Sequence, residues 1–171
     1  MRKRKIQISV AVRKIRAHKP TSPSDFTKIG LKLKWLKSGV FRETCRIVNC
    51  NLVVKFPLGF PTSKRKRIVS RYFEGKRHTR MEVDRLKRLA KFPFMREYLP
   101  KVHYYDQGTG TLVMSYHPPF VDREEQIDSI GKLVEALILK STGVRCSDLH
   151  SDNIHQKAEN HKRVVIIDLG Y

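Results

Sequence analysis

The residues best suited to chemistry lie near the end of the sequence. Asp148 and Asn153 stand five positions apart in a polar stretch, and Asp168 follows the apolar pair Ile166 and Ile167 and precedes a glycine. Mg²⁺ prefers hard oxygen ligands, so one aspartate and one asparagine make a reasonable metal-binding pair. A further aspartate could orient a reacting hydroxyl group and accept its proton. These residue types suit phosphoryl transfer from a nucleotide.

Two charged residues upstream could complete such a site. Lys55 lies inside the apolar segment 52–56, and Glu82 shares a helical face with Leu86 and Leu89, at spacings of four and seven. A lysine can hold the phosphates of a nucleotide, and a carboxylate can hold the lysine. Each residue has a simpler interpretation when it is taken alone. Lys55 would be an edge-strand lysine whose ammonium group reaches solvent, and Glu82 would pair with a nearby arginine.

Hydrophobic periodicity predicts the elements that position these residues. Alternation and turn signals predict strands near residues 31–35, 45–48, 52–56, 101–105, 111–116 and 163–167. Apolar stripes predict helices over 79–90 and 124–140. Alternation at 6–12 suggests a further short strand, 19–25 is typical of a linker, and 57–78 is expected to be irregular. This order predicts an α+β fold with a small antiparallel-sheet lobe first.

Composition excludes several classes of protein. The chain has 171 residues, and its 40% of hydrophobic residues argues against a wholly disordered chain. No apolar run approaches the roughly 18 residues that span a bilayer, so no membrane partner is expected. The N-terminus also lacks the apolar core of a secretory signal. Three scattered cysteines indicate neither a disulfide framework nor a zinc site, and they favour a reducing, cytoplasmic location.

The net charge of +20 is concentrated in two basic segments. From Arg2 to Lys19 there are eight Lys or Arg residues and no acid, and from Lys64 to Arg80 there are eight against Glu74 alone. Such segments predict a polyanionic partner such as nucleic acid, although no recognised nucleic-acid-reading motif accompanies them. The alternative interpretation is solvated, flexible surface.

Taken in order, the chemical residues resemble the motifs of the protein-kinase-like superfamily, over about residues 31–171. The resemblance implies a phosphate-covering loop at 36–44, a lysine with a helix-borne carboxylate partner, a hinge for the adenine edge, a catalytic aspartate and two metal ligands. By this resemblance, Gly39 and Phe41 belong to the phosphate-covering loop, and Lys55 and Glu82 are the lysine and its partner. Met114, Ser115 and Tyr116 form the hinge, with Met114 as the gatekeeper residue. Asp148 is the catalytic aspartate, and Asn153 and Asp168 are the metal ligands. The sequence Asp148-Leu149-His150 is similar to the form found in aminoglycoside and choline kinases.

Several positions depart from the family pattern. Lys37 and Arg42 stand where the first and third glycines of the phosphate loop usually lie, and Cys146 replaces the histidine before the catalytic aspartate. The sequence also ends at Tyr171, shortly after Asp168. The resemblance therefore implies a basic N-terminal arm at 1–28, a sheet lobe at 29–117, and a partial, C-terminally truncated helical lobe at 118–171.

The function that this resemblance implies is ATP- and Mg²⁺-dependent phosphotransfer. A protein Ser/Thr acceptor is expected, because the helices that build a small-molecule pocket in related kinases are missing. The missing C-terminal part motivates an alternative, a catalytically weak or inactive kinase-like module that binds nucleotide and acts by contact with a partner. Nucleic-acid contact through the two basic segments would be an accessory to either function.

Overall fold

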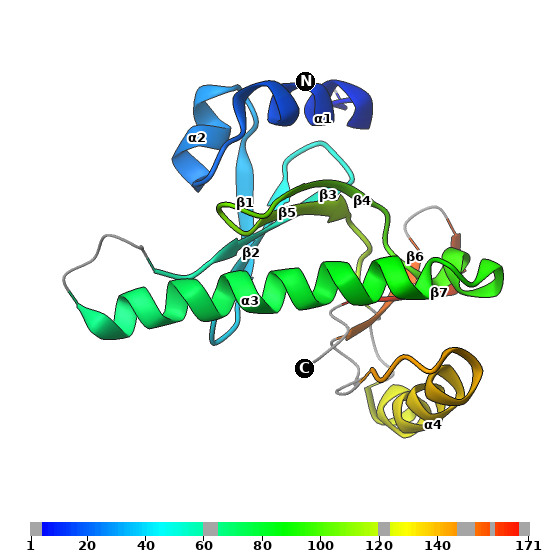
Figure 1. Ribbon diagram of the computed structural model, residues 1–171. Helices are drawn as coiled ribbons and strands as arrows, with labels where there is room; N and C mark the ends of the chain where they lie inside the picture. The colour runs from blue at the N-terminus through cyan, green and yellow to red at the C-terminus, as the bar shows by residue number, and fades with distance from the viewer. Residues whose placement is uncertain (1–4, 60–64, 120–123, 147–152, 158–159, 168–171) are drawn as a thin grey trace. The chain divides into compact units, whose positions relative to one another are not determined.

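The computed structural model describes residues 5–59, 65–119, 124–146, 153–157 and 160–167 (Figure 1). By their contacts, the residues form two compact units, Met1–Arg80 with Lys101–Tyr116, and Met81–Pro100 with His117–Tyr171. The elements follow in the order α1 (Ile8–His18), α2 (Pro23–Lys28), β1 (Leu33–Ser38), β2 (Arg42–Ile47), β3 (Leu52–Pro57), α3 (Lys66–Leu89), η1 (Pro93–Tyr98), β4 (Val102–Asp106), β5 (Thr111–Ser115), α4 (Glu124–Thr142), β6 (Ile154–Lys157) and β7 (Asn160–Ile166).

The first unit is built on a five-stranded antiparallel sheet with the order β1-β2-β3-β5-β4. Its hairpins lie where the sequence predicts them. Between β2 and β3, Asn49 adopts a left-handed backbone with φ of 60°, a conformation that asparagine tolerates better than most residues. Strand β3 has β2 on one side and β5 on the other, and five of its six residues are buried. It is therefore an interior strand.

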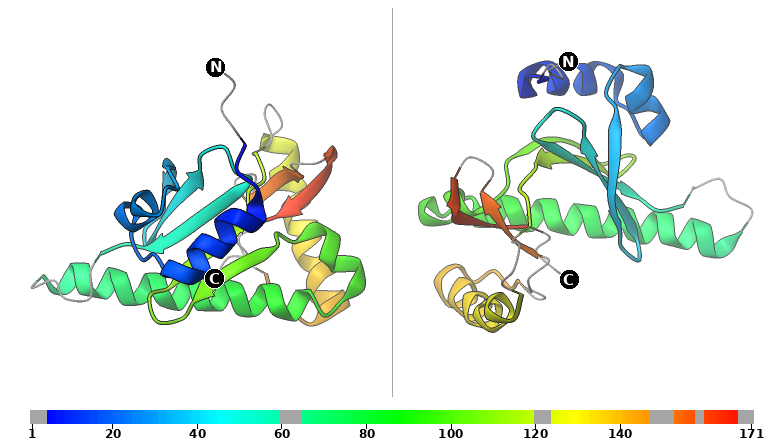
Figure 2. Two further views of the ribbon diagram at one scale, coloured as in Figure 1. Left: turned by 90° about the horizontal axis from the view of Figure 1, so that it is seen from above. Right: turned by 180° about the vertical axis from the view of Figure 1, so that it is seen from behind.

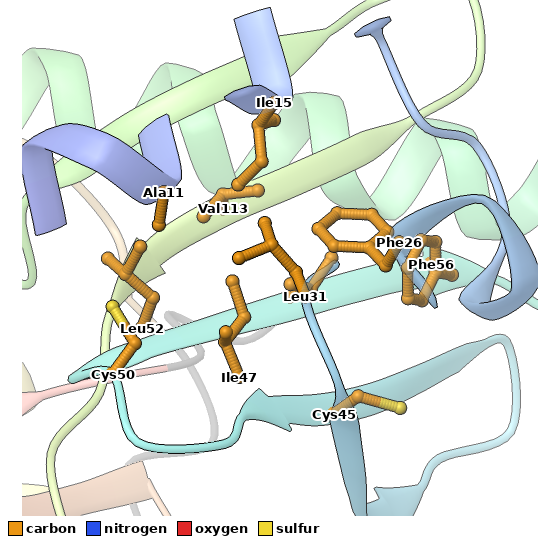
Figure 3. Close-up of a cluster of buried hydrophobic side chains, with 11 residues drawn as sticks. Ala11, Ile15, Phe26, Leu31, Cys45, Ile47, Cys50, Leu52, Phe56 and Val113 are labelled. Atoms are coloured by element: carbon orange, nitrogen blue, oxygen red, sulfur yellow. The ribbon is translucent and has the colours of Figure 1, made fainter. Parts of the chain in front are cut away.

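Helices α1 and α2 cover one face of this sheet, and the main hydrophobic core lies beneath them (Figure 3). The ring of Phe26 from α2 meets the ring of Phe56 from β3 edge to face, with centroids 5.5 Å apart. The buried residues of this core are Ala11, Ile15, Phe26, Leu31, Cys45, Ile47, Cys50, Leu52, Val54, Phe56 and Val113.

The expectation of a strand at residues 6–12 is wrong, because helix α1 begins at Ile8 and contains residues 8–12. Ala11 and Ile15 lie four residues apart on one helical face, and both are fully buried. Ile8, which alternation would place in a strand, is 36% exposed. The apolar positions fit both the two-residue repeat of a strand and the 3.6-residue repeat of a helix. Packing against the sheet stabilises the helix.

Helix α2 begins inside the segment expected to be a linker. Ser22 caps the helix by accepting a hydrogen bond from the Asp25 N–H, and the Asp25 carboxylate accepts one from the Thr21 N–H at 3.3 Å. This arrangement is a variant of the capping box in which the return bond comes from the residue before the N-cap, and a proline at the start of the helix supports it. The hydrogen bond from the Ser22 hydroxyl, and then the one from Lys28, hold the pKa of Asp25 below its ordinary value.

Helix α3 begins at Lys66, so the expectation that residues 57–78 are irregular is wrong from that point on. The helix comes very close to the sheet at Gly75. A Cβ atom built there would lie 2.4 Å from the Phe41 carbonyl oxygen and 2.9 Å from Pro57. Only a glycine allows this approach without a shift of the backbone.

The second unit contains the last turns of α3, helix α4 and the antiparallel β6–β7 hairpin (Figure 1). Strand β7 contacts η1, and His155 of β6 is tied to the segment after β5 through a 2.7 Å hydrogen bond between its Nδ1 and the His117 carbonyl oxygen. The helix predicted at 124–140 is confirmed as α4. Within the described part of the chain, no helix has the length and apolar character needed to cross a membrane.

Candidate active site

Lys55 occupies the interior of the sheet. In the register of β3 it lies opposite Thr44 of β2 and Leu112 of β5, and it is only 3% exposed. The interpretation of Lys55 as an edge-strand lysine therefore does not hold. Strand residues alternate between faces, and Val54 belongs to the core under α1 and α2, so Lys55 points to the opposite face. Lysine is rarely buried this deeply without a partner, and Lys55 is engaged in interactions here.

The expected gatekeeper residue lies on the same face as Lys55. Met114 pairs with Val53 across β3 and β5, while Lys55 pairs with Leu112. Met114 and Lys55 are therefore diagonal neighbours in the sheet, and Met114 is 1% exposed. The structure thus brings Lys55 and Met114 together on one face of the sheet.

Ser115 and Tyr116, the other two residues expected at the hinge, use their backbone N–H groups inside the protein. The Ser115 N–H donates to the Lys101 carbonyl oxygen at 2.9 Å, and the Tyr116 N–H donates to the Asn51 carbonyl oxygen at 3.0 Å. The Tyr116 ring also lies 4.2 Å from the guanidinium carbon of Arg46. Any contact that Ser115 and Tyr116 make with an adenine would have to use other atoms.

The expected phosphate loop is the turn between β1 and β2. Its Gly39 N–H donates to the Arg42 carbonyl oxygen at 2.8 Å. The Phe41 ring stacks on His78 of α3, with centroids 4.7 Å apart and planes 11° from parallel. Arg42, one of the cations that replace glycines, is 6% exposed and engaged in interactions. The structure thus packs both Phe41 and Arg42 into the protein.

Glu82 lies on the buried face of α3, as its spacing predicts. The side chain is 3% exposed, and the same face carries the buried residues Thr79, Val83, Leu86 and Leu89. Burial of a carboxylate is unfavourable unless a cation or several hydrogen bonds compensate it, and Glu82 is engaged in interactions. Lys55 belongs to the first unit and Glu82 to the second.

Asn153 stands immediately before the β6–β7 hairpin and is 8% exposed. Its carbonyl oxygen accepts a 2.7 Å hydrogen bond from the N–H of Ile167, the residue that directly precedes Asp168. The sequence gives no signal for this bond, because it depends on the pairing of β6 with β7. Asp148 and Asp168 themselves lie outside the described residues.

Cys146, the residue in place of the family histidine, is 4% exposed. Burial, together with the negative charge of Glu135, raises the pKa of its thiol above the ordinary value, although Arg85 acts in the opposite direction. The thiol is therefore protonated at neutral pH and unreactive. Cys146 acts here as a small buried residue.

Sequence reasoning missed a cationic groove between α1 and β4. A cavity of about 450 Å³ is lined there by Ile8, Ser9, Val12, Arg13, Arg16, Lys101 and His103. The sequence places Arg13 and Lys101 far apart, and the expectation of a strand at 6–12 hid the helix that joins them. The cluster of cations from Arg2 to Lys19 was the one signal that pointed to this region.

No protein-family model and no curated protein matches this sequence. Among solved structures, the chain is similar to the Rio2 kinase–ADP/Mg²⁺–phosphoaspartate complex from Chaetomium thermophilum, with a TM-score of 0.53 and 18% identity over 94% of this chain and 51% of that chain. A second similar structure is PpkA-294 in its apo form, with a TM-score of 0.48 and 15% identity over 82% of this chain and 57% of that one.

The likeness to Rio2 kinase shows that this chain has a protein-kinase-like fold. The α+β architecture and the antiparallel sheet lobe predicted from the sequence are thereby confirmed. The chain spans about half the length of the Rio2 chain that it matches. Because fold alone does not define activity, the chemistry has to be argued from the site.

Proposed function

We propose that this protein is a kinase-like phosphotransferase that moves the γ-phosphoryl group of ATP to a serine or threonine hydroxyl of a protein. The observation that carries the proposal is Lys55, a buried lysine on the interior strand of the sheet, on the same face as Met114. A lysine is rarely buried on an interior strand for structural reasons alone. Its ammonium group in this position suits the binding of nucleotide phosphates.

The roles follow from the chemistry of each side chain. The Lys55 ammonium group binds the α- and β-phosphates, and the Glu82 carboxylate holds the ammonium in place. Asp148 orients the acceptor hydroxyl and takes its proton as the oxygen bonds to the γ-phosphorus. The bond between that phosphorus and the β–γ bridging oxygen breaks, and ADP leaves. Most of the rate enhancement would come from positioning and charge neutralisation.

Asn153 and Asp168 would hold Mg²⁺ in this proposal. An amide and a carboxylate offer the hard oxygen atoms that this ion prefers. The N–H of Ile167, the residue before Asp168 in the sequence, donates to the Asn153 carbonyl oxygen. When bound, Mg²⁺ supplies positive charge that neutralises the phosphate oxygens. Among the residues that the structure describes, no group of three or more His, Cys, Asp or Glu side chains offers a competing metal site.

A second function, nucleotide binding without turnover, is favoured by the turn between β1 and β2. Phe41 is stacked on His78 and Arg42 is buried, so neither is presented toward a ligand. A loop with a single glycine also lets its backbone approach a phosphate less freely. The site could then bind nucleotide and act through a protein partner.

Phosphorylation assays decide between these functions. The wild type should transfer labelled γ-phosphate from ATP, in the presence of Mg²⁺, to itself or to a mixed protein substrate. Asp148→Asn should lower the rate by about 10²–10⁴-fold, the range typical of a general base. Asp168→Asn, which removes a proposed Mg²⁺ ligand, should also lower the rate. The control is Asp84→Asn, at an exposed position of α3, which should keep the wild-type rate. Equal residual phosphorylation in all four proteins would mean that this chain does not catalyse the transfer.

Nucleotide binding is measured separately by calorimetry with ADP and Mg²⁺. Lys55→Met should abolish binding, whereas Lys34→Met, an exposed lysine on β1, should leave it unchanged. Binding without turnover would select the second function. If Lys55→Met and Lys34→Met bound equally well, Lys55 would not be a phosphate ligand.

A further inference from the structure

Helix α1 lies over the sheet beside β4, within the first unit (Figure 2, left). The groove between them is lined by the cations Arg13, Arg16 and Lys101, together with His103, and by Ile8, Ser9 and Val12. Among the residues that the structure describes, no carboxylate lines this groove. Cations that converge without an acidic residue repel one another, so packing alone does not explain this cluster.

The cations of the groove are available to a ligand. Arg16 Nη2 donates to the His103 carbonyl oxygen at 3.2 Å, a bond that fixes the side chain but leaves its charge uncompensated. Across the described part of the chain, neither Arg13 nor Lys101 forms an ion pair, and both are exposed. Their positive charges therefore face the solvent side of the groove.

The pKa of His103 is affected by the positive charges that surround the groove. Burial lowers the pKa of its ring, and Lys101 and Arg16 lower it further. The ring is therefore neutral at neutral pH, and its Nε2 shares a 3.1 Å hydrogen bond with the Ser115 hydroxyl. His103 is thus an uncharged lining residue of the groove, held in place by its hydrogen bond to Ser115.

We propose that the α1–β4 groove binds the phosphodiester backbone of a nucleic acid. The 11 residues of α1 extend about 16 Å, and a nucleic-acid strand carries a phosphate about every 3.4 Å along its axis, so several phosphates can follow this helix. Arg13 and Arg16 stand one turn apart, and guanidinium groups suit phosphate oxygens. A cationic stripe along a helix is the expected footprint of nucleic-acid binding.

An acidic protein segment is the main competing ligand, and the sequence around the groove favours the nucleic acid. All eight charged residues from Arg2 to Lys19 are Lys or Arg, and a segment without acidic residues matches a uniformly charged backbone. The inference does not depend on the phosphotransferase activity, because none of its residues belongs to the proposed active site. It can therefore fail or hold independently.

The test is fluorescence anisotropy with labelled oligouridylate and with duplex DNA of equal length, over a series of salt concentrations. The double variant Arg13→Gln/Lys101→Gln should bind more weakly. Its slope of log K against log salt should fall by about 1.4 on the single strand, which is about 0.7 for each lost contact. The slope on duplex DNA should fall by about 0.9 for each contact. The nucleic acid that the wild type binds more tightly at equal salt concentration is the preferred ligand.

Two matched variants keep the test specific. Arg67→Gln/Arg71→Gln removes the same charge from exposed positions of α3 and should leave the slope closer to that of the wild type. Arg13→Lys/Lys101→Arg keeps the charge and should keep the slope. Equal losses at α1 and α3, a larger loss at α3, or tighter binding to polyglutamate than to either nucleic acid would each overturn the proposal. Thermal melting of every variant establishes that it is folded.

Discussion

Lys55 and Glu82, the two charged residues expected to act together, are both buried and therefore need compensating partners. Lys55 and Glu82 are each 3% exposed, so each has lost most of its hydration. The effective penalty for an unpaired buried ion is several kcal/mol. The kinase resemblance implies that they pair with each other, which would remove most of this penalty from both.

A double-mutant cycle tests this pairing. Lys55→Met and Glu82→Gln should each destabilise the protein by about 3 kcal/mol or more, because each leaves an uncompensated partner. The double variant should be more stable than the sum of the two losses predicts. Urea unfolding gives the free energies, with Lys34→Met as the exposed control. Additive losses would show that the two side chains are not partners.

At Gly39, a requirement of the fold for glycine can be distinguished from a requirement of nucleotide binding. Its φ is not in the left-handed region, and a Cβ atom there would lie 3.7 Å from the Arg42 carbonyl oxygen, an ordinary contact. The fold does not require a glycine at this position. A nucleotide phosphate that approaches the backbone would require one.

Gly39→Ala should therefore keep the melting temperature of the wild type and weaken the binding of ADP with Mg²⁺. Differential scanning fluorimetry without nucleotide measures the first quantity, and calorimetry measures the second. A variant that loses stability would contradict the open geometry of this turn. A variant that keeps full nucleotide affinity would remove Gly39 from the proposed binding site.

Residue types and order were enough to predict Lys55 on a strand and Glu82 on a buried helical face. They could not predict how Phe41 and Arg42 pack, because both depend on the contact between the β1–β2 turn and its surroundings in the folded chain. The groove cations were also hidden. Arg13 and Lys101 become neighbours only when α1 packs on β4, a contact between segments far apart in the sequence.

At the scale of secondary-structure elements, the sequence predicted most accurately the strands that are joined by recognisable turn residues. The Asn49 turn and the Gly108–Gly110 segment define two hairpins, and a regular apolar stripe defines α4. Helix α3 was underestimated because its buried face is made partly of small or polar residues, Gly75, His78, Thr79 and Glu82 among them. A search for hydrophobic periodicity does not detect such a face, because few of its residues are apolar.

Gly75→Ala tests the close approach of α3 to the sheet. Alanine favours a helix by about 1 kcal/mol over glycine, so propensity alone predicts stabilisation. The added methyl group would instead meet the Phe41 carbonyl oxygen and Pro57, and overpacking of this kind destabilises by about 1–3 kcal/mol. We expect a net loss in urea unfolding. Ser70→Ala, at an exposed position of the same helix, should be neutral or slightly stabilising, and a stabilised Gly75→Ala would contradict the packing described here.

At the scale of the whole molecule, the proposed functional residues are divided between the two units. Lys55 and Met114 belong to the first, and Glu82 and Asn153 belong to the second. A nucleotide that uses both sets must bind preferentially to the folded state of each unit. Ligand binding at 100 times Kd stabilises a folded state by about 2.7 kcal/mol, so amides that exchange through unfolding should be protected about a hundredfold.

Hydrogen exchange with ADP and Mg²⁺ should therefore slow in both units. The reporters are the amides of β3 in the first unit and of Ile167 in the second, where the N–H donates to the Asn153 carbonyl oxygen. Asp168→Asn, which removes a proposed metal ligand, should keep the added protection in β3 and lose it at Ile167. Protection confined to β3 in the wild type would mean that nucleotide binds the first unit alone. The protein would then bind nucleotide without the metal site that phosphoryl transfer requires.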